Sequence, residues 1–562
     1  MNVMRTLLSA SLLVGLALPL LASPDPVRFD SFEYTGRDEI FATPLKPGEY
    51  RNPILAGYYP DPSLCRVGDD YYLINSTFAH FPGIPIFHSR DLVNWKQIGN
   101  AISRPDQLPY DGLGVTRGIF APAISYHDGV FYIVCTHVDA GGNFVLTATD
   151  PAGPWSDPIW LDFDGIDPSI FFDESTGRAW IVNNGNPPDN QPLYEGHRAI
   201  WIQEWDIAAK RPTGPRRIII NGGVDLAQKP VWIEGPHIFK RGEWYYLNCA
   251  EGGTSIHHSQ VIFRSRQPDG PYTPHPRPTL TQRDLPEDRL HPVTCTGHAD
   301  LEIGPDGKWW AVFLGCTPYT GGHYNTGRQT FLLPVTWSED GWPQILPPGE
   351  AVPFVGKGPA GAGLREDPKL PLTGNFTWRD EFDRAELGDP WLFLRAPKET
   401  WWTLADGALH LTPRPDALRE RHNPTFVGRR LQHNRFVAQT TLNLPAQVGV
   451  TAGLSAFHNE THHYNFGVRR ASPAGSRYEI TVEAQKGAAE NAQFTLAELT
   501  AAPGTPVTLR LTGHDTDYVF DYSTDGGATW TQVGGTFDAR ALSVETSYDF
   551  IGVLLGLYAR TP

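Results

Sequence analysis

The chain is poor in cysteine and methionine, and neither residue type forms a recognisable site. Among 562 residues there are five cysteines and two methionines. An odd number of cysteines without CxxC spacing fits neither a disulfide framework nor a zinc site. We therefore predict buried single thiols, which pack as small apolar side chains, and leave one disulfide open for an oxidising compartment. The cysteines are Cys65, Cys135, Cys249, Cys295 and Cys316.

Positive charge and several enzyme motifs are also scarce or missing. The 46 Lys and Arg residues are outnumbered by 62 Asp and Glu residues, which gives a net charge of −16. Nucleic-acid binding depends on basic side chains that neutralise phosphates, so we expect no nucleic-acid partner. The sequence has no HExxH, no GxSxG elbow and no GxxxxGK[S/T] phosphate loop. These absences argue against zinc proteases, serine hydrolases and nucleotide enzymes.

Beyond the first 23 residues the chain has no long apolar run. Residues 1–23 carry Arg5 and then an apolar stretch from Leu7 to Ala22. This pattern predicts a cleaved signal peptide and an exported protein, periplasmic or extracellular. A membrane anchor is the alternative, but the run is short for a membrane span and no second one follows. We therefore expect no membrane partner.

What the chain does contain is a fivefold repeat. Each copy has an apolar strand start, a turn with Asp, Gly or Ser, and a returning run rich in Tyr, Trp, Phe and Val, as in buried strands. The copies begin roughly 45 to 70 residues apart, the spacing of four-stranded propeller blades. We predict an all-β fold with a five-bladed β-propeller over residues 52–354. The copies lie at 59–77, 120–137, 166–185, 231–253 and 297–316.

The flanking segments have a different character. Residues 24–51 are Pro-rich and unpatterned, which predicts a lead-in segment, and the Gly/Pro-rich residues 355–374 predict a linker. From residue 375 to 562 short alternating runs, such as Val507–Thr512, are separated by turn residues. This pattern predicts an antiparallel β-sandwich as the second domain.

The first residues of the repeat copies supply the candidate site. Alignment on x-Pro-x-[Ile/Leu] puts Asp61, Ala121, Asp167, Gly235 and, in an imperfect copy, His298 in register. The inner strands of a propeller begin at one end of a central channel, so these side chains should converge. Acids without partners are costly to bury there, so a purely structural reason for collecting them is weak.

Two carboxyl groups suffice to hydrolyse a glycosidic bond, because one protonates the leaving oxygen and the other activates water or attacks the sugar. Glu234, one residue before the register, has an apolar setting that would raise its pKa and suit a general acid. Asp61 lies between two prolines that fix its backbone, which suits a base. Asp167 would orient the acid and raise its pKa. The structural alternatives are that Glu234 is a carboxylate that caps a turn and that Asp61 belongs to an Asp-Pro turn.

The high content of aromatic residues fits a carbohydrate ligand. Aromatic residues make up 12% of the chain, including 17 Trp, and sugar rings stack on such side chains, although most of them should be sheet core. A non-catalytic, sugar-binding propeller whose acids only accept hydrogen bonds from hydroxyls is therefore an alternative of another class.

Three motifs now identify a family resemblance. NPILAGYYPDPSLC, GIDPSIFF and IEGPHIFKRGEWYYL closely resemble glycoside hydrolase family 43, and the C-terminal part resembles the concanavalin-like sandwich of its xylosidase-type members. The resemblance implies inversion of the anomeric configuration, with Asp61 as base, Glu234 as acid and Asp167 as the residue that tunes the acid. It implies no required cofactor and no metal in catalysis, while a calcium ion near His298 or in the sandwich stays open.

The resemblance also implies substrate contacts. Phe78 would belong to the apolar pocket wall, His298 to an axial water or ion site, and Arg328 to the terminal sugar site. Two departures from the family pattern are expected at the pocket rim. Phe120 replaces a tryptophan, and Ala79-His80 replaces Glu-Trp.

We therefore expect an exo-acting, inverting glycoside hydrolase that releases terminal D-xylose from xylo-oligosaccharides or xylan. An α-L-arabinofuranosidase acting on arabinoxylan is the close alternative, because the two pentoses can place similar hydroxyls around the scissile bond. An invertase-like relative that retains configuration is set aside, because its nucleophile motif is missing. The sequence makes no prediction of oligomeric state.

Overall fold

The computed structural model describes residues 24–286, 288–359, 362, 369–472 and 476–562. The predicted signal peptide, residues 1–23, lies outside this part of the chain. The all-β prediction is confirmed, since the one α-helix of the described residues is the single turn α1 (Val544–Ser547). No helix in these ranges is long and apolar enough to cross a membrane. Short 3₁₀ helices are η1 (Glu39–Phe41), η2 (Pro188–Asn190), η3 (Leu226–Gln228), η4 (Thr320–Gly322) and η6 (Ala539–Leu542).

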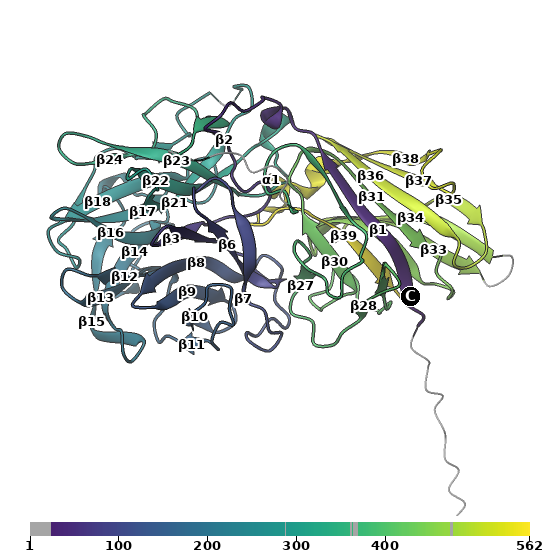
Figure 1. The fold of residues 1–562 in the computed structure, drawn as a ribbon, viewed down its shortest axis with the longest axis horizontal. Helices are drawn as coiled ribbons and strands as arrows, with labels where there is room; N and C mark the ends of the chain where they lie inside the picture. Colours follow the sequence, from purple (N-terminus) through teal and green to yellow (C-terminus); the bar gives the residue numbers. More distant parts are fainter. Residues whose placement is uncertain (1–23, 287, 360–361, 363–368, 473–475) are drawn as a thin grey trace, which may run out of the picture.

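Five antiparallel sheets follow one another along the first part of the described chain (Figure 1). The first contains β3 (Ser63–Val67), β4 (Asp70–Ile74), β6 (Gly83–Ser89) and β7 (Lys96–Ile102). The second contains β8 (Gly118–His127), β9 (Val130–Val138), β10 (Gly142–Ala148) and β11 (Ile159–Trp160). The third contains β12 (Ile166–Asp173), β13 (Arg178–Gly185), β14 (Ala199–Asp206) and β15 (Arg211–Asn221).

The remaining two sheets have the same plan. The fourth contains β16 (Glu234–Arg241), β17 (Trp244–Glu251), β18 (Ser259–Ser265) and β19 (Thr273–Pro274), with β20 (Leu280–Thr281) also paired to β18. The fifth contains β21 (Thr294–Ile303), β22 (Trp309–Cys316), β23 (Gln329–Trp337) and β24 (Pro343–Gln344). The first strands β3, β8, β12, β16 and β21 contact one another in sequence, and β21 contacts β3. These five strands, the inner ring, therefore surround a common axis.

The second part of the chain, together with β1 from its start, forms two packed antiparallel sheets, and a sandwich was predicted for this part. One contains β28 (Trp402–Ala405), β29 (Ala408–Leu411), β1 (Val27–Gly36), β31 (Arg435–Asn443), β36 (Pro506–His514), β37 (Asp517–Ser523) and β38 (Thr531–Asp538), with β26 (Phe376–Asp380) on β1. The other contains β30 (Phe426–Arg430), β39 (Leu554–Arg560), β32 (Thr451–Asn459), β33 (His462–Ser472), β34 (Arg477–Lys486) and β35 (Asn491–Thr500). Residues alternate between buried and half-buried along β31, as a half-covered sheet requires.

The prediction of an unpatterned lead-in over residues 24–51 is wrong for its first half. Strand β1 runs through the sandwich sheet and pairs with β31, β26 and β29 (Figure 1). Its alternation is broken by a register shift between Phe29 and Ser31, so Phe29 and Phe32 both face the core. The chain thus starts in the sandwich before it enters the five sheets.

Short strands and shared core join the two parts. Strand β5 (His80–Phe81) pairs with β27 (Phe393–Leu394), and β2 (Glu49–Arg51) pairs with β25 (Val355–Lys357). One hydrophobic cluster includes Ile84 of the first sheet as well as Phe393. His80 is fully buried in this junction, so the expectation that the Ala79-His80 departure touches the pocket rim is wrong for His80. All five cysteines are buried and unpaired, as the single-thiol prediction requires.

Candidate active site

The five register positions share one unusual backbone conformation. The φ angles are 52° at Asp61, 28° at Ala121, 53° at Asp167, 56° at Gly235 and 51° at His298. Positive φ is uncommon for residues other than glycine, and such strain concentrates at functional sites. The last four lie within register shifts of their strands. Every copy therefore begins with the same kink, and the residues aligned in the sequence occupy equivalent places around the axis.

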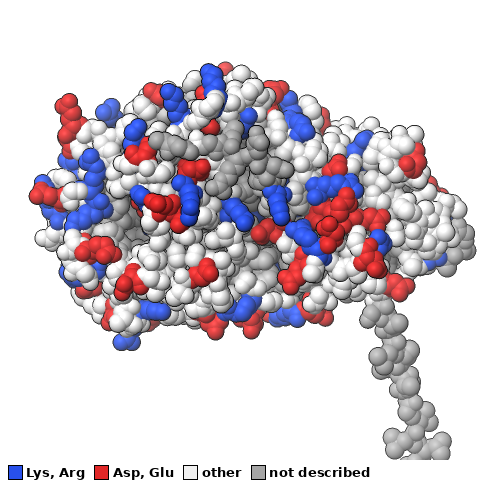
Figure 2. Space-filling view, in the orientation of Figure 1, with Lys and Arg blue, Asp and Glu red and all other residues white. Residues whose placement is uncertain are grey.

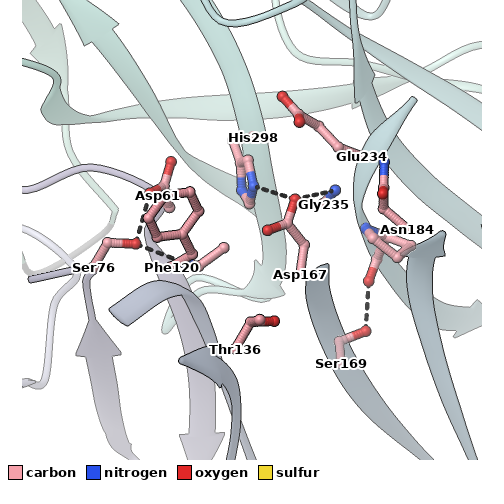
Figure 3. Close-up of polar contacts among 12 residues, drawn as sticks. Asp61, Ser76, Phe120, Thr136, Asp167, Ser169, Asn184, Glu234, Gly235 and His298 are labelled. Carbon is pink, nitrogen blue, oxygen red and sulfur yellow. Dashed lines mark hydrogen bonds and ion pairs between the residues drawn. The ribbon is translucent and has the colours of Figure 1, made fainter. Parts of the chain in front are cut away.

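Asp61 is a buried carboxylate with strong partners. Its Oδ1 accepts a hydrogen bond of 2.9 Å from Arg328 Nη1, and its Oδ2 accepts one of 2.6 Å from Ser76 Oγ. Ser76 is itself fixed, because its Oγ accepts from the amide of Ala121 at 2.7 Å (Figure 3). Burial alone would raise the pKa of Asp61, but the Arg328 charge, with smaller help from His298 and Ser76, holds it below the usual value. Asp61 is therefore ionised at neutral pH.

Glu234 begins β16 and has the opposite environment. Its side chain is 14% exposed, and the nearest basic group is His258 Nδ1, at 3.9 Å from Oε1. That nitrogen also lies 2.6 Å from the Gly253 carbonyl oxygen, and burial lowers the pKa of His258 to about 3, so the imidazole is neutral. Burial, followed by the negative charge of Asp167, raises the pKa of Glu234 to about 8. Glu234 therefore keeps its proton at neutral pH.

Asp167 and His298 lie between Asp61 and Glu234 (Figure 3). Asp167 Oδ2 accepts from the Gly235 amide at 3.2 Å and lies 3.6 Å from His298 Nε2. Burial would lower the pKa of His298, but its contact with the Asp167 carboxylate and the surrounding carboxylates raise it to about 9. The imidazole is therefore cationic, and it holds Asp167 beside the residue that follows Glu234.

This charge state bears on the candidate ion sites. The other nitrogen of His298, Nδ1, has no hydrogen-bond partner among the described residues. A protonated ring can donate from this nitrogen to a water or a sugar hydroxyl. The water and the ion expected near His298 both stay predictions. Within the described chain one group could hold a metal ion, formed by Asp416, Glu420 and His422 of the sandwich.

An aromatic wall stands beside Asp61. The ring of Phe78 lies 5.1 Å from that of Phe120 and 6.3 Å from that of Phe550, and the rings of Phe120 and Phe550 are 5.8 Å apart. Phe78 is almost fully buried, so it supports the wall, whereas Phe120 and Phe550 are half-buried. Phe550 comes from the sandwich, and its carbonyl accepts from Arg328 Nη2 at 3.4 Å. The second domain thus contributes directly to this site.

The structure brings together all seven residues expected at the site. Arg328, expected on the terminal sugar, also forms an ion pair with Asp61. Sequence reasoning missed Ser76, His258 and Phe550. Ser76 stands near the end of the first repeat copy, two residues before Phe78, which is a weak signal. His258 and Phe550 come from loops whose approach depends on the packing of sheets and domains.

Comparisons with known proteins give matches over both parts of the chain. Residues 50–343 match the model of glycosyl hydrolases family 43, and residues 379–562 match the beta xylosidase C-terminal concanavalin A-like domain. The chain is 37% identical over 523 residues to a non-reducing end alpha-L-arabinofuranosidase of Bacteroides ovatus, covering 91% of each chain. It is 40% identical over 422 residues to a xylosidase/arabinosidase of Butyrivibrio fibrisolvens, covering 73% of this chain and 78% of that one. A crystal structure of a GH43_12 protein from a capybara gut metagenome superposes with a TM-score of 0.87 at 39% identity, covering 96% and 100%.

Proposed function

Because the chain belongs to glycosyl hydrolase family 43, we propose that this glycoside hydrolase releases terminal pentoses from xylan-type glycans by a single displacement with inversion. The opposite protonation of Asp61 and Glu234 carries the proposal. Glu234 protonates the glycosidic oxygen as the bond breaks. Asp61 takes a proton from the water that attacks the anomeric carbon from the other side. A binding module would need no such difference between two buried carboxyl groups.

Asp167 and His298 act on the two reacting groups without supplying the proton. The charge of Asp167 keeps the proton on Glu234, and its hydrogen bond to Gly235 fixes the backbone beside the acid. His298 offers its unpaired Nδ1–H to the water or to a sugar hydroxyl. No cofactor is needed, because two carboxyl groups suffice. A calcium ion near His298 or in the sandwich remains an open proposal.

The fold supports action at chain ends. We take the five sheets to be the blades of a five-bladed propeller, with boundaries near residues 52 and 354, because their first strands close into the inner ring. Phe550 of the sandwich and Phe120 of β8 narrow the space beside Asp61, which favours a pocket for one terminal sugar over an open groove. On the face drawn in Figure 2 acidic and basic side chains are interspersed, as suits a neutral glycan better than a polyanion.

Two pentoses are candidates for the released sugar. The C-terminal sandwich resembles that of xylosidase-type members, which favours D-xylose. The similarity to the Bacteroides ovatus protein, which extends over nine tenths of both chains, favours L-arabinofuranose. The substitution of Phe120 for tryptophan in the aromatic wall is where the two specificities would be expected to separate. With residues 1–23 as a signal peptide, the substrate would be met outside the cytoplasm.

An NMR time course distinguishes these alternatives. Xylobiose and an arabinose-substituted xylo-oligosaccharide are followed separately, and the first anomer released is recorded. Early α-xylose supports an inverting β-xylosidase, and early β-L-arabinofuranose supports an inverting α-L-arabinofuranosidase. The retained anomer would contradict the single displacement, and internal fragments released from xylan would contradict action at chain ends. No release from either substrate would favour the binding module.

A further inference from the structure

Exposed apolar side chains gather next to the general acid. The described chain exposes nine large hydrophobic side chains, and five of them lie on the loops that lead into or out of the site ends of the third, fourth and fifth sheets. None of these five belongs to the machinery described above. They are Leu193, Val231, Trp232, Ile256 and Leu290.

Trp232 is the member of this group that lies nearest to Glu234 in the chain. It is 36% exposed although it stands two residues before the acid, and its φ of 50° is a strained conformation for a bulky side chain. Its amide donates to the Gly196 carbonyl at 2.8 Å. Such strain persists only where the surroundings hold it in place, and it is characteristic of binding sites.

The indole of Trp232 is supported from one side. The guanidinium carbon of Arg198 lies 4.6 Å from the ring centroid. Arg198 is held in turn by Asn184, at 3.1 Å from its Nε, and by Asn186, at 2.6 Å from its Nη1. Because a fixed cation covers one face of the indole, the exposed area belongs to a ring that is already oriented. The indole is therefore held in a fixed orientation and can serve as a stacking platform, unlike a mobile surface side chain.

The exposed strip continues away from Trp232 toward the sandwich. Val231 contacts the loop at Gly196 so closely that a Cβ on that glycine would lie 2.8 Å from it. Ile256 and Leu290 follow on the next two loops and line a cavity of about 1030 Å³. Tyr319, in the loop between β22 and β23, and Arg435 of the sandwich line the same cavity, so it lies between the two domains. We call Trp232, Val231, Ile256 and Leu290 the apolar strip.

We propose that Trp232 stacks on the first sugar of the leaving group and that the apolar strip guides a neutral β-linked glycan chain toward the cavity between the domains. The inference rests on the proposed function, because the acid fixes where the leaving group must be. Glu234 protonates the glycosidic oxygen, so the departing chain begins on the Glu234 side of the pocket. Sugar rings stack through their apolar C–H faces on indoles, and the strip carries no charge that a neutral chain would leave unpaired. The preferred substrate is then a long chain rather than a disaccharide.

Binding of the leaving-group chain can be measured without hydrolysis. The Asp61→Asn protein is titrated calorimetrically with xylose, xylobiose and linear xylohexaose, alone and combined with Trp232→Ala. We expect xylohexaose to bind at least tenfold more tightly than xylobiose, and Trp232→Ala to weaken xylohexaose at least tenfold while changing xylose less than twofold. Trp160→Ala is the matched control, because Trp160 is 42% exposed but lies on β11, the outermost strand of the second sheet.

A second variant keeps the test independent of the folding of Trp232→Ala. Leu290→Ser should weaken xylohexaose about threefold and leave xylobiose unchanged, because Leu290 lies at the far end of the strip and is 84% exposed. Xylohexaose affinities within twofold of the parent for both variants overturn the inference. If wild-type protein still releases pentose in that case, the proposed function stands. If wild-type protein releases no pentose from any xylan substrate, the proposed function fails whatever the titrations show.

Discussion

Asp61 and Glu234 are both buried carboxyl groups, yet they have opposite charge states at neutral pH. Each carries a carboxyl group at the head of an inner-ring strand, removed from bulk water. Asp61 meets a cationic guanidinium at 2.9 Å, whereas Glu234 meets a neutral imidazole at 3.9 Å and the negative charge of Asp167. Burial opposes ionisation on both sides, so the nearest charge decides the outcome. The comparison assigns the base and the acid by their partners, and each prediction below changes one of them.

The largest effect is expected from removing the base. Asp61→Asn keeps the shape of the side chain and an oxygen that can accept from Arg328, but it cannot accept the proton of the attacking water. We expect kcat to fall by about 10³ to 10⁴. Since the leaving group plays no part in this loss, glycosides with good and poor leaving groups should suffer equally. A loss limited to poor leaving groups would reverse the assignment of the two sides.

Removing the acid should cost less and should depend on the leaving group. Glu234→Gln is expected to lower kcat/KM for an oligosaccharide by about 10² to 10³, and for a 2,4-dinitrophenyl pentoside by about tenfold or less, because that group needs no proton. Wild-type activity should fall as pH rises through about 8, since the acid must be protonated. The variant should lack this alkaline limb. If the alkaline limb is unchanged in Glu234→Gln, another group is responsible for it.

The partner of the base can be changed while the base is kept. In wild-type enzyme Arg328 holds the pKa of Asp61 below its usual value, so activity should persist to low pH and fall only as Asp61 gains its proton. Arg328→Met should raise that pKa and move the acidic limb upward, because the charge that lowers it is gone. The variant should therefore lose more of its activity at pH 5 than at pH 7. Arg328→Lys keeps a charge and should move the limb less, and an unmoved limb in both variants would contradict the role of the ion pair.

Local patterns predicted the fold wherever the pattern was unbroken. The five copies were found because each turn, proline and aromatic run lies within about 20 residues of its partner strand, as in β16 and β17. Strand β1 was missed because a register shift at Ser31 breaks its alternation and because its partner β31 lies at the other end of the chain. A strand with both an interrupted pattern and a distant partner is not recognised from the sequence. Either feature alone would leave it recognisable.

The same distinction separates the site residues that local patterns predict from those that depend on distant parts of the chain. Asp61, Asp167 and His298 could be placed because the repeat carries its register around the axis, and Glu234 followed from its neighbour Gly235. Phe550 could not be placed, because nothing in its local sequence encodes the docking of the sandwich. The ion pair of Asp61 with Arg328 was likewise beyond the motif, since it depends on the first and fifth sheets meeting when the inner ring closes.

The smallest effect tests why one register position carries no side chain. A Cβ on Gly235 would lie 2.8 Å from His298 Cε1, and the φ of 56° disfavours any side chain there. Gly235→Ala should therefore destabilise the fold by more than the roughly 1–2 kcal/mol of the backbone strain alone. It should also displace the imidazole that holds Asp167, lowering kcat about fivefold and raising the pKa of Glu234 further above its usual value, because the His298 cation lowers that pKa. Gly242→Ala, in the turn at the other end of β16, is the matched control, because its φ is 61° and no atom lies within 4 Å of the added carbon. Thermal unfolding and the alkaline limb of the pH profile, measured for both variants, separate the effect of backbone strain from that of the contact with His298. Equal losses would mean that the glycine serves the backbone alone, and that the Glu234 side of the site does not depend on the fit of His298 against it.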